Sequence, residues 1–374
     1  MASPVIPRVI IGVDLDYFYA QCEEVRNPSI RGKPVVICVY SGRTEESGAV
    51  STSNYPARKL GVKSGIPIIL AKRILANYPE SVFLPIDLDY YRIVSDRIME
   101  MIRPIGDKFE QASVDEAYLD VSLKSHGSFD GALDIASRIK QEILANEKMT
   151  CSVGIGQNKL MAKMAVDSKK PNGLTVIPPG QESLFLSQLP LGRLYGIGPK
   201  TEDKLRSIGI STIGELALAD RENLSDLFGK KQGPMLKEMA NGVDESLVVE
   251  RPIEQMSRIV TLKHDALIYD FSEVLKPISI DLAEKLASSH LMCKSVSIIA
   301  ITSDLKIRSR SKSLGEATKS ADQIYTVAGE LFSSFFKVQG DPKQNEPRLR
   351  RVGIKISDFV SVPPAKTETL EDFI

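Results

Sequence analysis

An apolar segment that ends in acidic side chains is the feature that most constrains the fold of this chain. Residues 9–13 read Val-Ile-Ile-Gly-Val, and Asp14 and Asp16 follow directly. A short apolar run of this kind predicts a buried strand. Carboxylates at the end of a buried strand are costly to desolvate unless another group pairs with them. The fold therefore has to supply a partner at this end of the strand.

A second acidic pair, Asp115 and Glu116, lies in a turn between strands predicted over 108–111 and 117–121. Two divalent cations about 3.5–4 Å apart are natural partners for such carboxylates and suit phosphoryl transfer. Mg²⁺ favours a few carboxylates together with phosphate oxygens of a substrate. Either acidic segment alone fits turn capping or solvent exposure as well as it fits a metal site. The two together, with a basic region between them, favour a metal site.

Length and composition indicate an intracellular globular protein. The 374 residues suggest two to four domains, and 43% hydrophobic and 26% charged residues are ordinary values. The chain has no run of about 18 apolar residues and no secretion signal at its N-terminus, so we expect a cytoplasmic protein without a membrane partner. Four scattered cysteines predict reduced core residues rather than disulfides or a zinc site: Cys22, Cys38, Cys151 and Cys293.

The charge distribution is uneven although the net charge is zero. Residues 26–81 carry nine Lys or Arg and three Asp or Glu, which gives +6. Residues 82–121 carry four and nine respectively, which gives −5. A basic region beside an acidic one suits a protein that holds both phosphates and divalent cations.

Apolar periodicity and Gly or Pro breakers predict mixed helices and strands up to residue 173. Strands are predicted over 9–13, 34–40, 108–111, 117–121 and 150–156. Helices are predicted over 17–25, 54–60, 68–75, 90–102, 132–146 and 160–166. Residues 174–247 read as mainly helical, 248–256 as a linker, and a mixed strand and helix pattern starts at Ser257. The last nine residues, from Lys366, read as a tail.

Three motifs together resemble the signature segments of Y-family, lesion-bypass DNA polymerases of the archaeal DNA polymerase IV type. They are Val-Asp-Leu-Asp-Tyr-Phe-Tyr-Ala at 13–20, Ser-Val-Asp-Glu-Ala-Tyr at 113–118 and Lys-Pro-Asn-Gly at 170–173. The resemblance runs over nearly the whole chain. It implies an α+β multidomain right hand: a ferredoxin-like palm (1–25 and 82–173), small fingers (26–81), a helical thumb with a helix-hairpin-helix (174–247), the linker, an α/β little finger (257–365) and the tail.

The resemblance also implies the chemistry. It is template-directed addition of deoxynucleotides to a primer, with low fidelity, and the chain shows no separate acidic set for proofreading. The implied cofactors are two Mg²⁺ ions, for which Mn²⁺ can substitute. Their implied ligands are Asp14, Asp115, Glu116 and the backbone carbonyl of Leu15, while Asp16 is expected to be a structural acid.

The expected nucleotide pocket follows the first acidic strand. Backbone N–H groups at Tyr17 and Phe18 can meet phosphate oxygens. Tyr19 matches the family's steric gate against a ribose 2′-hydroxyl, although spacing alone fits a core aromatic equally well. The resemblance assigns the triphosphate to Thr52, Tyr55, Arg58 and Lys170. Taken singly, Arg58 and Lys170 also fit solvated surface charges.

Two further regions are expected to hold DNA. Gly196, Gly198 and Lys200 fit a helix-hairpin-helix whose backbone amides approach a phosphate, although a plain helical corner would also use glycines. In the last domain, alternating cations are predicted to share one strand face that binds phosphates: Lys306, Arg308, Arg310 and Lys312, with Arg351 and Lys355 on a second strand.

The expected partners are primer–template DNA, a deoxynucleoside triphosphate and a sliding clamp, and the chain is expected to be a monomer. Leu370, Phe373 and Ile374 form one apolar face at the C-terminus and resemble a clamp-binding peptide. Thr367 and Ile374 depart from that motif, so modest affinity is expected. A frayed terminus is the alternative.

Two other functions compete with this hypothesis. A diguanylate-type nucleotide cyclase has a similar acidic palm, but its turn carries Gly-Gly where this chain has Ser-Val at 113–114. The hairpin and the cationic strand would also have no purpose in a cyclase. A non-catalytic DNA-binding relative of the polymerases is disfavoured because the carboxylates are intact.

Overall fold

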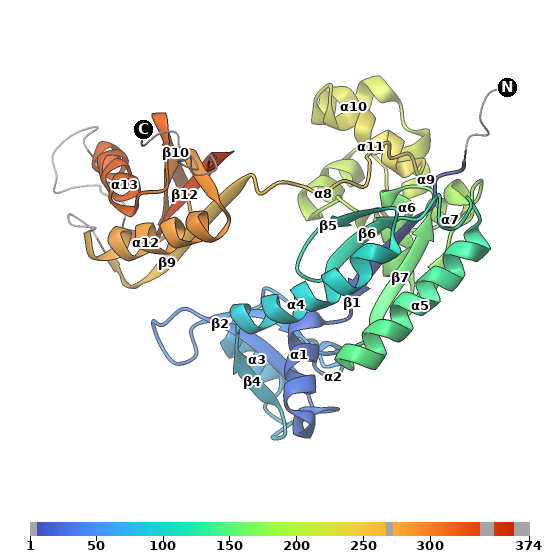
Figure 1. Ribbon diagram of the computed structural model, residues 1–374, viewed down its shortest axis with the longest axis horizontal. Helices are drawn as coiled ribbons and strands as arrows, with labels where there is room; N and C mark the ends of the chain where they lie inside the picture. The colour runs from blue at the N-terminus through green and yellow to red at the C-terminus, as the bar shows by residue number, and fades with distance from the viewer. Residues whose placement is uncertain (1–5, 267–271, 337–347, 363–374) are drawn as a thin grey trace, which may run out of the picture. The chain divides into compact units, whose positions relative to one another are not determined.

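The computed structural model describes residues 6–266, 272–336 and 348–362, which divide into two compact units (Figure 1). The N-terminal unit comprises residues up to 39 and 49–251, and the C-terminal unit comprises 40–48 and the chain from 252. In the described part of the chain, no helix combines the length and apolar character needed to cross a membrane.

A five-stranded sheet forms the centre of the N-terminal unit. Its strand order is β5-β6-β1-β7-β8. The strands are β1 (Ile10–Leu15), β5 (Lys108–Gln111), β6 (Glu116–Asp120), β7 (Cys151–Gly156) and β8 (Leu174–Val176). β1 is antiparallel to both neighbours, β6 and β7. The first four strands in this order have the arrangement of a ferredoxin-like fold, which confirms the palm predicted from the sequence.

Alternation along β1 sends its side chains to two different layers. Ile11 and Val13 are fully buried in a large core with residues of α1 (Phe18–Arg26), α4 (Leu88–Ile102) and α5 (Phe129–Glu147). The other face carries Gly12 and Asp14 and is covered by α6 (Lys159–Ser168). The acidic end of β1 therefore points toward α6.

Glycines let α6 pack directly on the sheet. A Cβ atom at Gly154 would lie 2.3 Å from the carbonyl oxygen of Ala162 and 2.3 Å from the backbone nitrogen of Val166. A Cβ atom at Gly156 would meet Met161 at 2.7 Å. Real side chains do not approach this closely, so glycine is required for the backbone of α6 to reach β7. This close contact fixes the height of α6 above the carboxylates.

A smaller three-stranded sheet, in the order β3-β2-β4, follows α1 in the chain. It consists of β2 (Val35–Tyr40), β3 (Gly48–Ser53) and β4 (Val82–Pro85), with α2 (Tyr55–Lys59) and α3 (Ile68–Ile74). Val36, Val50, Ile68 and other apolar residues form its core. The sequence analysis predicted β2 and both helices but not β3 or β4.

Five helices follow β8: α7 (Glu182–Ser187), α8 (Pro199–Ser207), α9 (Ile213–Leu218), α10 (Arg221–Phe228) and α11 (Gln232–Ala240). They bury Leu186, Leu205 and Leu224 in a core that also contains Leu160 and Met164 of α6. α9 begins with a capping box in which Thr212 and Glu215 satisfy each other's backbone N–H groups. The helical prediction for 174–247 is thus correct except for β8, a three-residue strand too short for a periodic pattern.

The C-terminal unit has a four-stranded antiparallel sheet in the order β11-β10-β12-β9. Its elements are β9 (Gln255–Ala266), α12 (Ser272–Ser288), β10 (Leu291–Thr302), β11 (Ile307–Thr318), α13 (Ala321–Phe336) and β12 (Leu349–Ser361). Both helices contribute to one core with Val296, Ile298 and Ile354. β9 begins inside the range predicted as linker, before Ser257.

The four cysteines are buried and form no disulfide, as predicted. Burial raises the pKa of the Cys293 thiol to about 11 and that of Cys151 to about 12. Both thiols are therefore protonated near neutral pH and have little nucleophilic character.

Candidate active site

Strand register brings the two predicted acidic segments together. Asp14 lies directly opposite Glu116 in the antiparallel pair of β1 and β6. The pairing continues past the strand end, because the Leu15 N–H donates to the carbonyl of Asp115 at 2.8 Å. Opposed residues of an antiparallel pair share a sheet face, so Asp14 and Glu116 both point toward α6.

Two lysines compensate the charge of these carboxylates. Lys163 Nζ on α6 lies 2.9 Å from Asp14 Oδ2 and 3.3 Å from Glu116 Oε1. Lys170 Nζ lies 2.6 Å from the same Asp14 oxygen and 2.9 Å from Asp167 Oδ1. Burial alone would lower the pKa of Lys163, but the neighbouring carboxylates outweigh it and raise the pKa above its usual value. Lys163 is therefore a permanent cation in the site.

The donor chemistry of this end of the sheet fits a hard cation. Asp14, Glu116 and Asp115 offer carboxylate oxygens, and the Asp115 carboxylate accepts a hydrogen bond from Ser113 Oγ at 2.6 Å. Within the described residues, no three His, Cys, Asp or Glu side chains are grouped closely enough to hold a metal ion by themselves. Mg²⁺ does not require such a group, because it takes a few carboxylates and fills its coordination with water and substrate phosphate oxygens.

Asp16 has a different environment from Asp14. Its carboxylate is 1% exposed and accepts hydrogen bonds from Ser152 Oγ (2.7 Å), Thr150 Oγ1 (2.8 Å) and the Asn172 N–H (2.8 Å). These donors come from β7, from the residue before it and from the segment that carries Lys170. Asp16 therefore holds that segment against the sheet, as expected for a structural acid.

One cavity of about 300 Å³ is lined by all seven residues predicted to bind the nucleotide. Its lining is Asp14, Leu15, Tyr17, Phe18, Tyr19, Ser51, Thr52, Tyr55, Arg58, Ser64, Val114, Asp115 and Lys170. Carboxylates and cations thus line the same small space. A charged phosphate chain with its metal counterions requires this combination.

Aromatic packing fixes the position of Tyr19, the residue predicted to contact the sugar. The Tyr19 ring stacks on Tyr91, with centroids 4.6 Å apart and planes 18° apart. Tyr91 is buried and donates to Glu23 Oε1 at 3.0 Å, so it is a rigid support. Desolvation, followed by the charge of Asp115, raises the pKa of the Tyr19 phenol. The Phe18 side chain is in the core, which leaves only its backbone to face the cavity.

Arg58 is held at the rim of the cavity by three contacts. Its Nε donates to the Ser53 carbonyl at 2.8 Å, its Nη2 donates to Thr52 Oγ1 at 3.2 Å, and its guanidinium lies 5.1 Å from the Tyr55 ring centroid. The Tyr55 ring in turn makes an edge contact with Tyr17 at 5.3 Å. Arg58 therefore contacts two of the other residues predicted to bind the triphosphate, Thr52 and Tyr55, whereas Lys170 contacts Asp14 and Asp167.

Unlike Asp14 and Asp115, Glu116 lines a different cavity, of about 750 Å³, on the α6 side of the sheet. Tyr195, Met235 and Met239 of the helical region contribute to its wall. The Tyr118 hydroxyl donates to Glu116 Oε1 at 2.7 Å and orients that carboxylate. Glu116 therefore lines the space next to the helices after β8, and it is not among the residues that line the 300 Å³ cavity.

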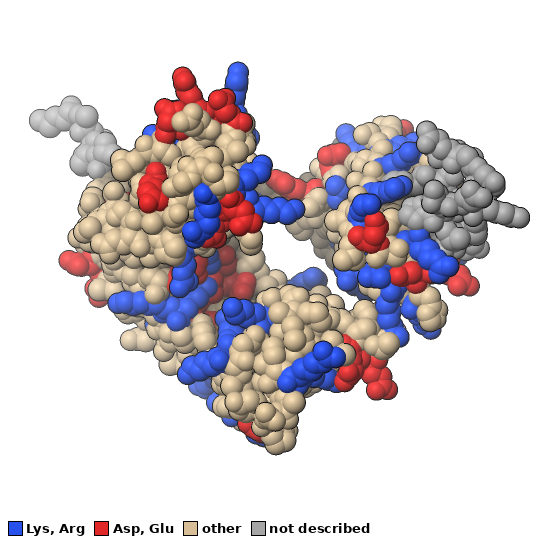
Figure 2. Space-filling view, turned by 180° about the vertical axis from the view of Figure 1, so that it is seen from behind, with Lys and Arg blue, Asp and Glu red and all other residues tan. Residues whose placement is uncertain are grey.

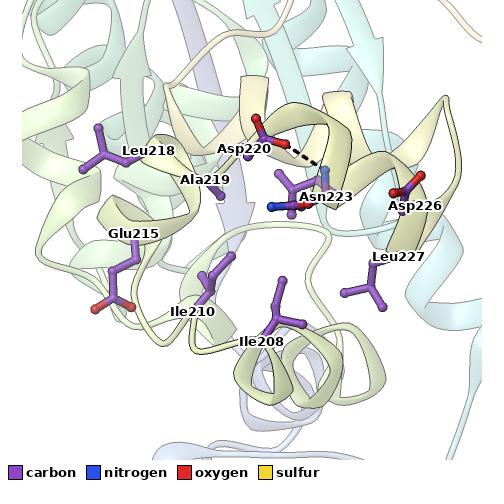
Figure 3. A pocket seen from close by; sticks show the side chains of 10 residues that line it. Ile208, Ile210, Glu215, Leu218, Ala219, Asp220, Asn223, Asp226 and Leu227 are labelled. Atoms are coloured by element: carbon purple, nitrogen blue, oxygen red, sulfur yellow. Dashed lines mark hydrogen bonds between the residues drawn. The ribbon is translucent and has the colours of Figure 1, made fainter.

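The turn of the predicted hairpin lies between a three-residue 3-10 helix, Leu191–Arg193, and α8. Gly196 adopts a positive φ of 87° and Gly198 caps the N-terminus of α8, which contains the exposed Lys200. A positive φ is strained for other residues, so glycine at 196 is required by the turn. A cavity of about 700 Å³ in the same region is lined by apolar side chains and the acids Glu215, Asp220 and Asp226 (Figure 3). It shares no lining residue with the carboxylate site.

The prediction for the first cationic strand requires a correction. Arg308, Arg310 and Lys312 do alternate on β11, but Lys306 lies in the preceding turn, where it pairs with Asp304 at 2.9 Å. Arg310 lies opposite the buried Ile298, so the three cations share the sheet face that the helices cover. Lys312 Nζ contacts Glu330 of α13 at 2.7 Å.

All three remain exposed because β11 is an edge strand beyond the helix-covered core. Figure 2 shows Lys and Arg side chains spread over the C-terminal unit, with Asp and Glu among them. Arg351 and Lys355 lie on β12, on the face opposite Val352 and Ile354 as predicted, and therefore on the other face of the sheet from the β11 cations. The predicted clamp-binding residues lie outside the described part of the chain: Leu370, Phe373 and Ile374.

Lys163 and Tyr91 were not found by the sequence analysis. Lys163 is an ordinary helix residue in sequence, and its burial depends on the glycines beneath α6. The only sequence signal was Gly154 and Gly156 in a predicted strand, which indicates close approach of another backbone.

Comparisons with known proteins agree with this geometry. Residues 13–167 match the model described as the impB/mucB/samB family, and residues 253–370 match the C-terminal domain of that family. Residues 192–244 match the model described as the DNA polymerase-iota thumb domain.

Similar proteins cover nearly the whole chain. DNA polymerase IV 1 of Methanosarcina mazei is 42% identical over 93% of this chain and 95% of its own. DNA polymerase IV of Metallosphaera sedula is 40% identical over 98% and 99%. Among solved structures, the Y-family chimera Dbh-Dpo4(243-245)-Dbh superposes with a TM-score of 0.85 at 37% identity, covering 94% of this chain and 99% of its own. A DinB crystal structure from Sulfolobus solfataricus gives 0.64 at 36% identity, covering 93% and 98%. The chain therefore belongs to the Y-family, as an error-prone lesion-bypass DNA-directed DNA polymerase of the DNA polymerase IV type.

Proposed function

We propose that the cavity beside Asp14 and Asp115 is the nucleotidyl-transfer site. Deoxynucleoside triphosphates would react there with a primer 3′-hydroxyl. The observation that carries this proposal is the shared lining of that cavity by carboxylates, by Arg58 and Lys170, and by Tyr19. Asp14, Asp115, Glu116 and the Leu15 carbonyl would hold two Mg²⁺ ions, or Mn²⁺ in their place. These ions would acidify the primer hydroxyl and neutralise the triphosphate and the leaving pyrophosphate.

The protein's own residues position the reacting groups. Arg58, held by Thr52 and Ser53, would clamp phosphate oxygens with a planar fork. Lys170 would contribute a point charge to the same phosphate chain, and its position depends on the Asp16 hydrogen bonds described above. The backbone N–H groups of Tyr17 and Phe18 lie where the chain enters α1 and can approach a phosphate.

Sugar selection would come from Tyr19. Its ring is backed by Tyr91, so it cannot move aside for a 2′-hydroxyl without breaking the stacked pair. A rigid support makes exclusion by clash effective, because a mobile ring would simply rotate.

The proposed partners are inferred from glycines and positively charged side chains in the regions that follow the active site in the chain. Gly196, Gly198 and Lys200 would approach the backbone of primer–template DNA without reading its sequence. Arg308, Arg310, Lys312, Arg351 and Lys355 would contact further phosphates. The C-terminal peptide would bind a sliding clamp with modest affinity helped by tethering to DNA.

The assignment of the metal ligands predicts that site variants lose primer extension but still bind DNA. Asp115→Asn and Glu116→Gln should each abolish primer extension at saturating Mg²⁺ and nucleotide, while primer–template binding by fluorescence anisotropy stays within about twofold. Glu142→Gln removes an equally negative side chain on α5 and should leave extension unchanged. Near-normal extension by either site variant would refute the ligand assignment.

A further inference from the structure

Glu110 is a buried carboxylate outside the proposed site. It lies on β5, an edge strand of the palm sheet, and its side chain is 0% exposed. Carboxylates are almost never fully buried unless they are paired. Glu110 Oε2 accepts a hydrogen bond from Lys159 Nζ at 2.8 Å, and Lys159 is itself 8% exposed. The pair joins β5 to the start of α6.

The remaining contacts of Glu110 come from the segment that leads out of the unit. The Val249 N–H donates to Oε2 at 3.3 Å. Arg251 Nε lies 2.8 Å from Oε1 as an ion pair, although it is not aligned for a hydrogen bond. One carboxylate thus holds two residues of a segment that has no helix or strand of its own.

The same segment is fixed along its length. The Gly242 carbonyl accepts from Asn158 Nδ2 at 2.7 Å, and Asp244 Oδ2 accepts from the Leu160 N–H at 3.1 Å. The Val248 side chain is 1% exposed, in a cluster with Ile10 and Tyr118. We name residues 242–251 the strap. Several strap residues also line the 750 Å³ cavity that Glu116 shares.

We propose that Glu110 is a positioning residue that anchors the strap. Only residues 252–254 then remain as a free connection to β9, which begins at Gln255. Three residues between two fixed ends span at most about 14 Å. If the strap detached back to Gly242, the free connection would reach about 45 Å. The anchor therefore sets the length of this connection, while residues 40–48, which belong to the C-terminal unit, provide a second place where the chain passes between the units.

The size of the effect follows from connection length. Effective concentration falls roughly as the −3/2 power of the length of a flexible connection. Release of Val249 and Arg251 alone would lower it about twofold, and release of the whole strap about sixfold. Apparent affinity for primer–template should fall by this factor. This predicted loss of primer–template affinity rests on the proposed DNA contacts of the C-terminal unit.

The variants must remove the anchor without leaving a buried unpaired charge. Glu110→Met combined with Lys159→Met replaces both partners by apolar groups, which is often tolerated. Arg251→Gln removes only the strap side of the ion pair, and Arg251 is 65% exposed, so folding is not at risk. Arg138→Gln is the control, since Arg138 is a 68% exposed arginine paired with Glu142 on α5.

Amide hydrogen exchange of the full chain tests the anchor without reference to DNA. The Val249 amide, which donates to Glu110, should exchange more slowly than the amides of Ile253 and Glu254 in the natural protein. In the Glu110→Met, Lys159→Met variant, exchange of the Val249 amide should accelerate by at least about tenfold, because a hydrogen bond to a charged acceptor is lost. Arg251→Gln should show a smaller acceleration, and Arg138→Gln none.

Two results separate failure of the anchor from failure of the proposed function. Equal exchange of the Val249 amide in the natural protein and the double variant overturns the anchor. Faster exchange with unchanged primer–template affinity supports the anchor and overturns the assignment of DNA binding to the C-terminal unit. The maximal rate of single-turnover incorporation at saturating DNA should be unchanged, since Glu110 touches no reacting group. A loss of that rate would contradict a purely positioning role.

Discussion

Substitution of Asp16 by Asn tests whether this acid is structural. The Asp16 carboxylate accepts three hydrogen bonds in a 1% exposed position. Hydrogen bonds to a charged acceptor are each worth about 1.5–3 kcal/mol. The amide keeps one acceptor oxygen but turns a donor toward a second donor, so we expect a net loss of about 2–4 kcal/mol. For a domain of this size that is a decrease in Tm of about 5–15 °C.

Differential scanning calorimetry measures the unfolding transition. Single-turnover incorporation at varied nucleotide concentration measures the apparent affinity of the site for nucleotide. Asp16→Asn should raise the apparent Kd for nucleotide, because the segment with Lys170 loses its bond from the Asn172 N–H. Exposed Asp130 on α5 provides the control, and Asp130→Asn should change stability by less than about 0.5 kcal/mol. If Asp16→Asn melts like the natural protein but has lost all extension, Asp16 is a ligand and the reasoning is wrong.

Three other outcomes are expected. Tyr19→Ala should raise ribonucleotide relative to deoxyribonucleotide incorporation in a competition assay; an unchanged ratio would make Tyr19 a packing residue only. Gly154→Ala should destabilise by about 3 kcal/mol or more in calorimetry, since its Cβ would meet backbone at 2.3 Å, whereas Gly329→Ala in α13 has open space and should be neutral or stabilising by up to about 1 kcal/mol. Neutralising Arg308 and Lys312 together should reduce the salt slope of DNA binding by about two; an unaltered slope would mean that neither contacts a phosphate.

The carboxylate pairing could be predicted because buried strands have few possible arrangements. The runs ending at Asp14 and beginning at Glu116 are both fully apolar on one face, and a short turn forces the second into a hairpin with β5. Pairing of such strands in one sheet brings their acidic ends together. The sequence therefore contained most of the palm and the identity of its acids.

The orientation of the β11 cations could not be predicted in the same way. Period-two alternation shows that Arg308, Arg310 and Lys312 share a face, but it does not say which face of the sheet that is. An edge strand is exposed on both sides, so its own residues give no signal. The answer depends on the partner strand, where Ile298 is buried under the helices.

Short strands were missed for a related reason. β4 and β8 have four and three residues, too few to display a period. Lys163 was missed because nothing in a helical lysine signals burial. Only the arrangement of glycines in the strand below determines that its ammonium lies among carboxylates.

Gly154 and Gly156 let the backbone of α6 pack directly on β7, so this helix is held rigidly on the sheet. Lys163 touches Asp14, and Lys159, one turn earlier, touches Glu110. A turn of helix is about 5.4 Å long, and with backbone seated on backbone it has no clearance in which to tilt or slide. Because the helix cannot shift and the two lysines share no partner, their substitutions should add nearly independently in a double-mutant cycle. The attachment of the strap can therefore change at one end of this turn without moving the ammonium group at the other.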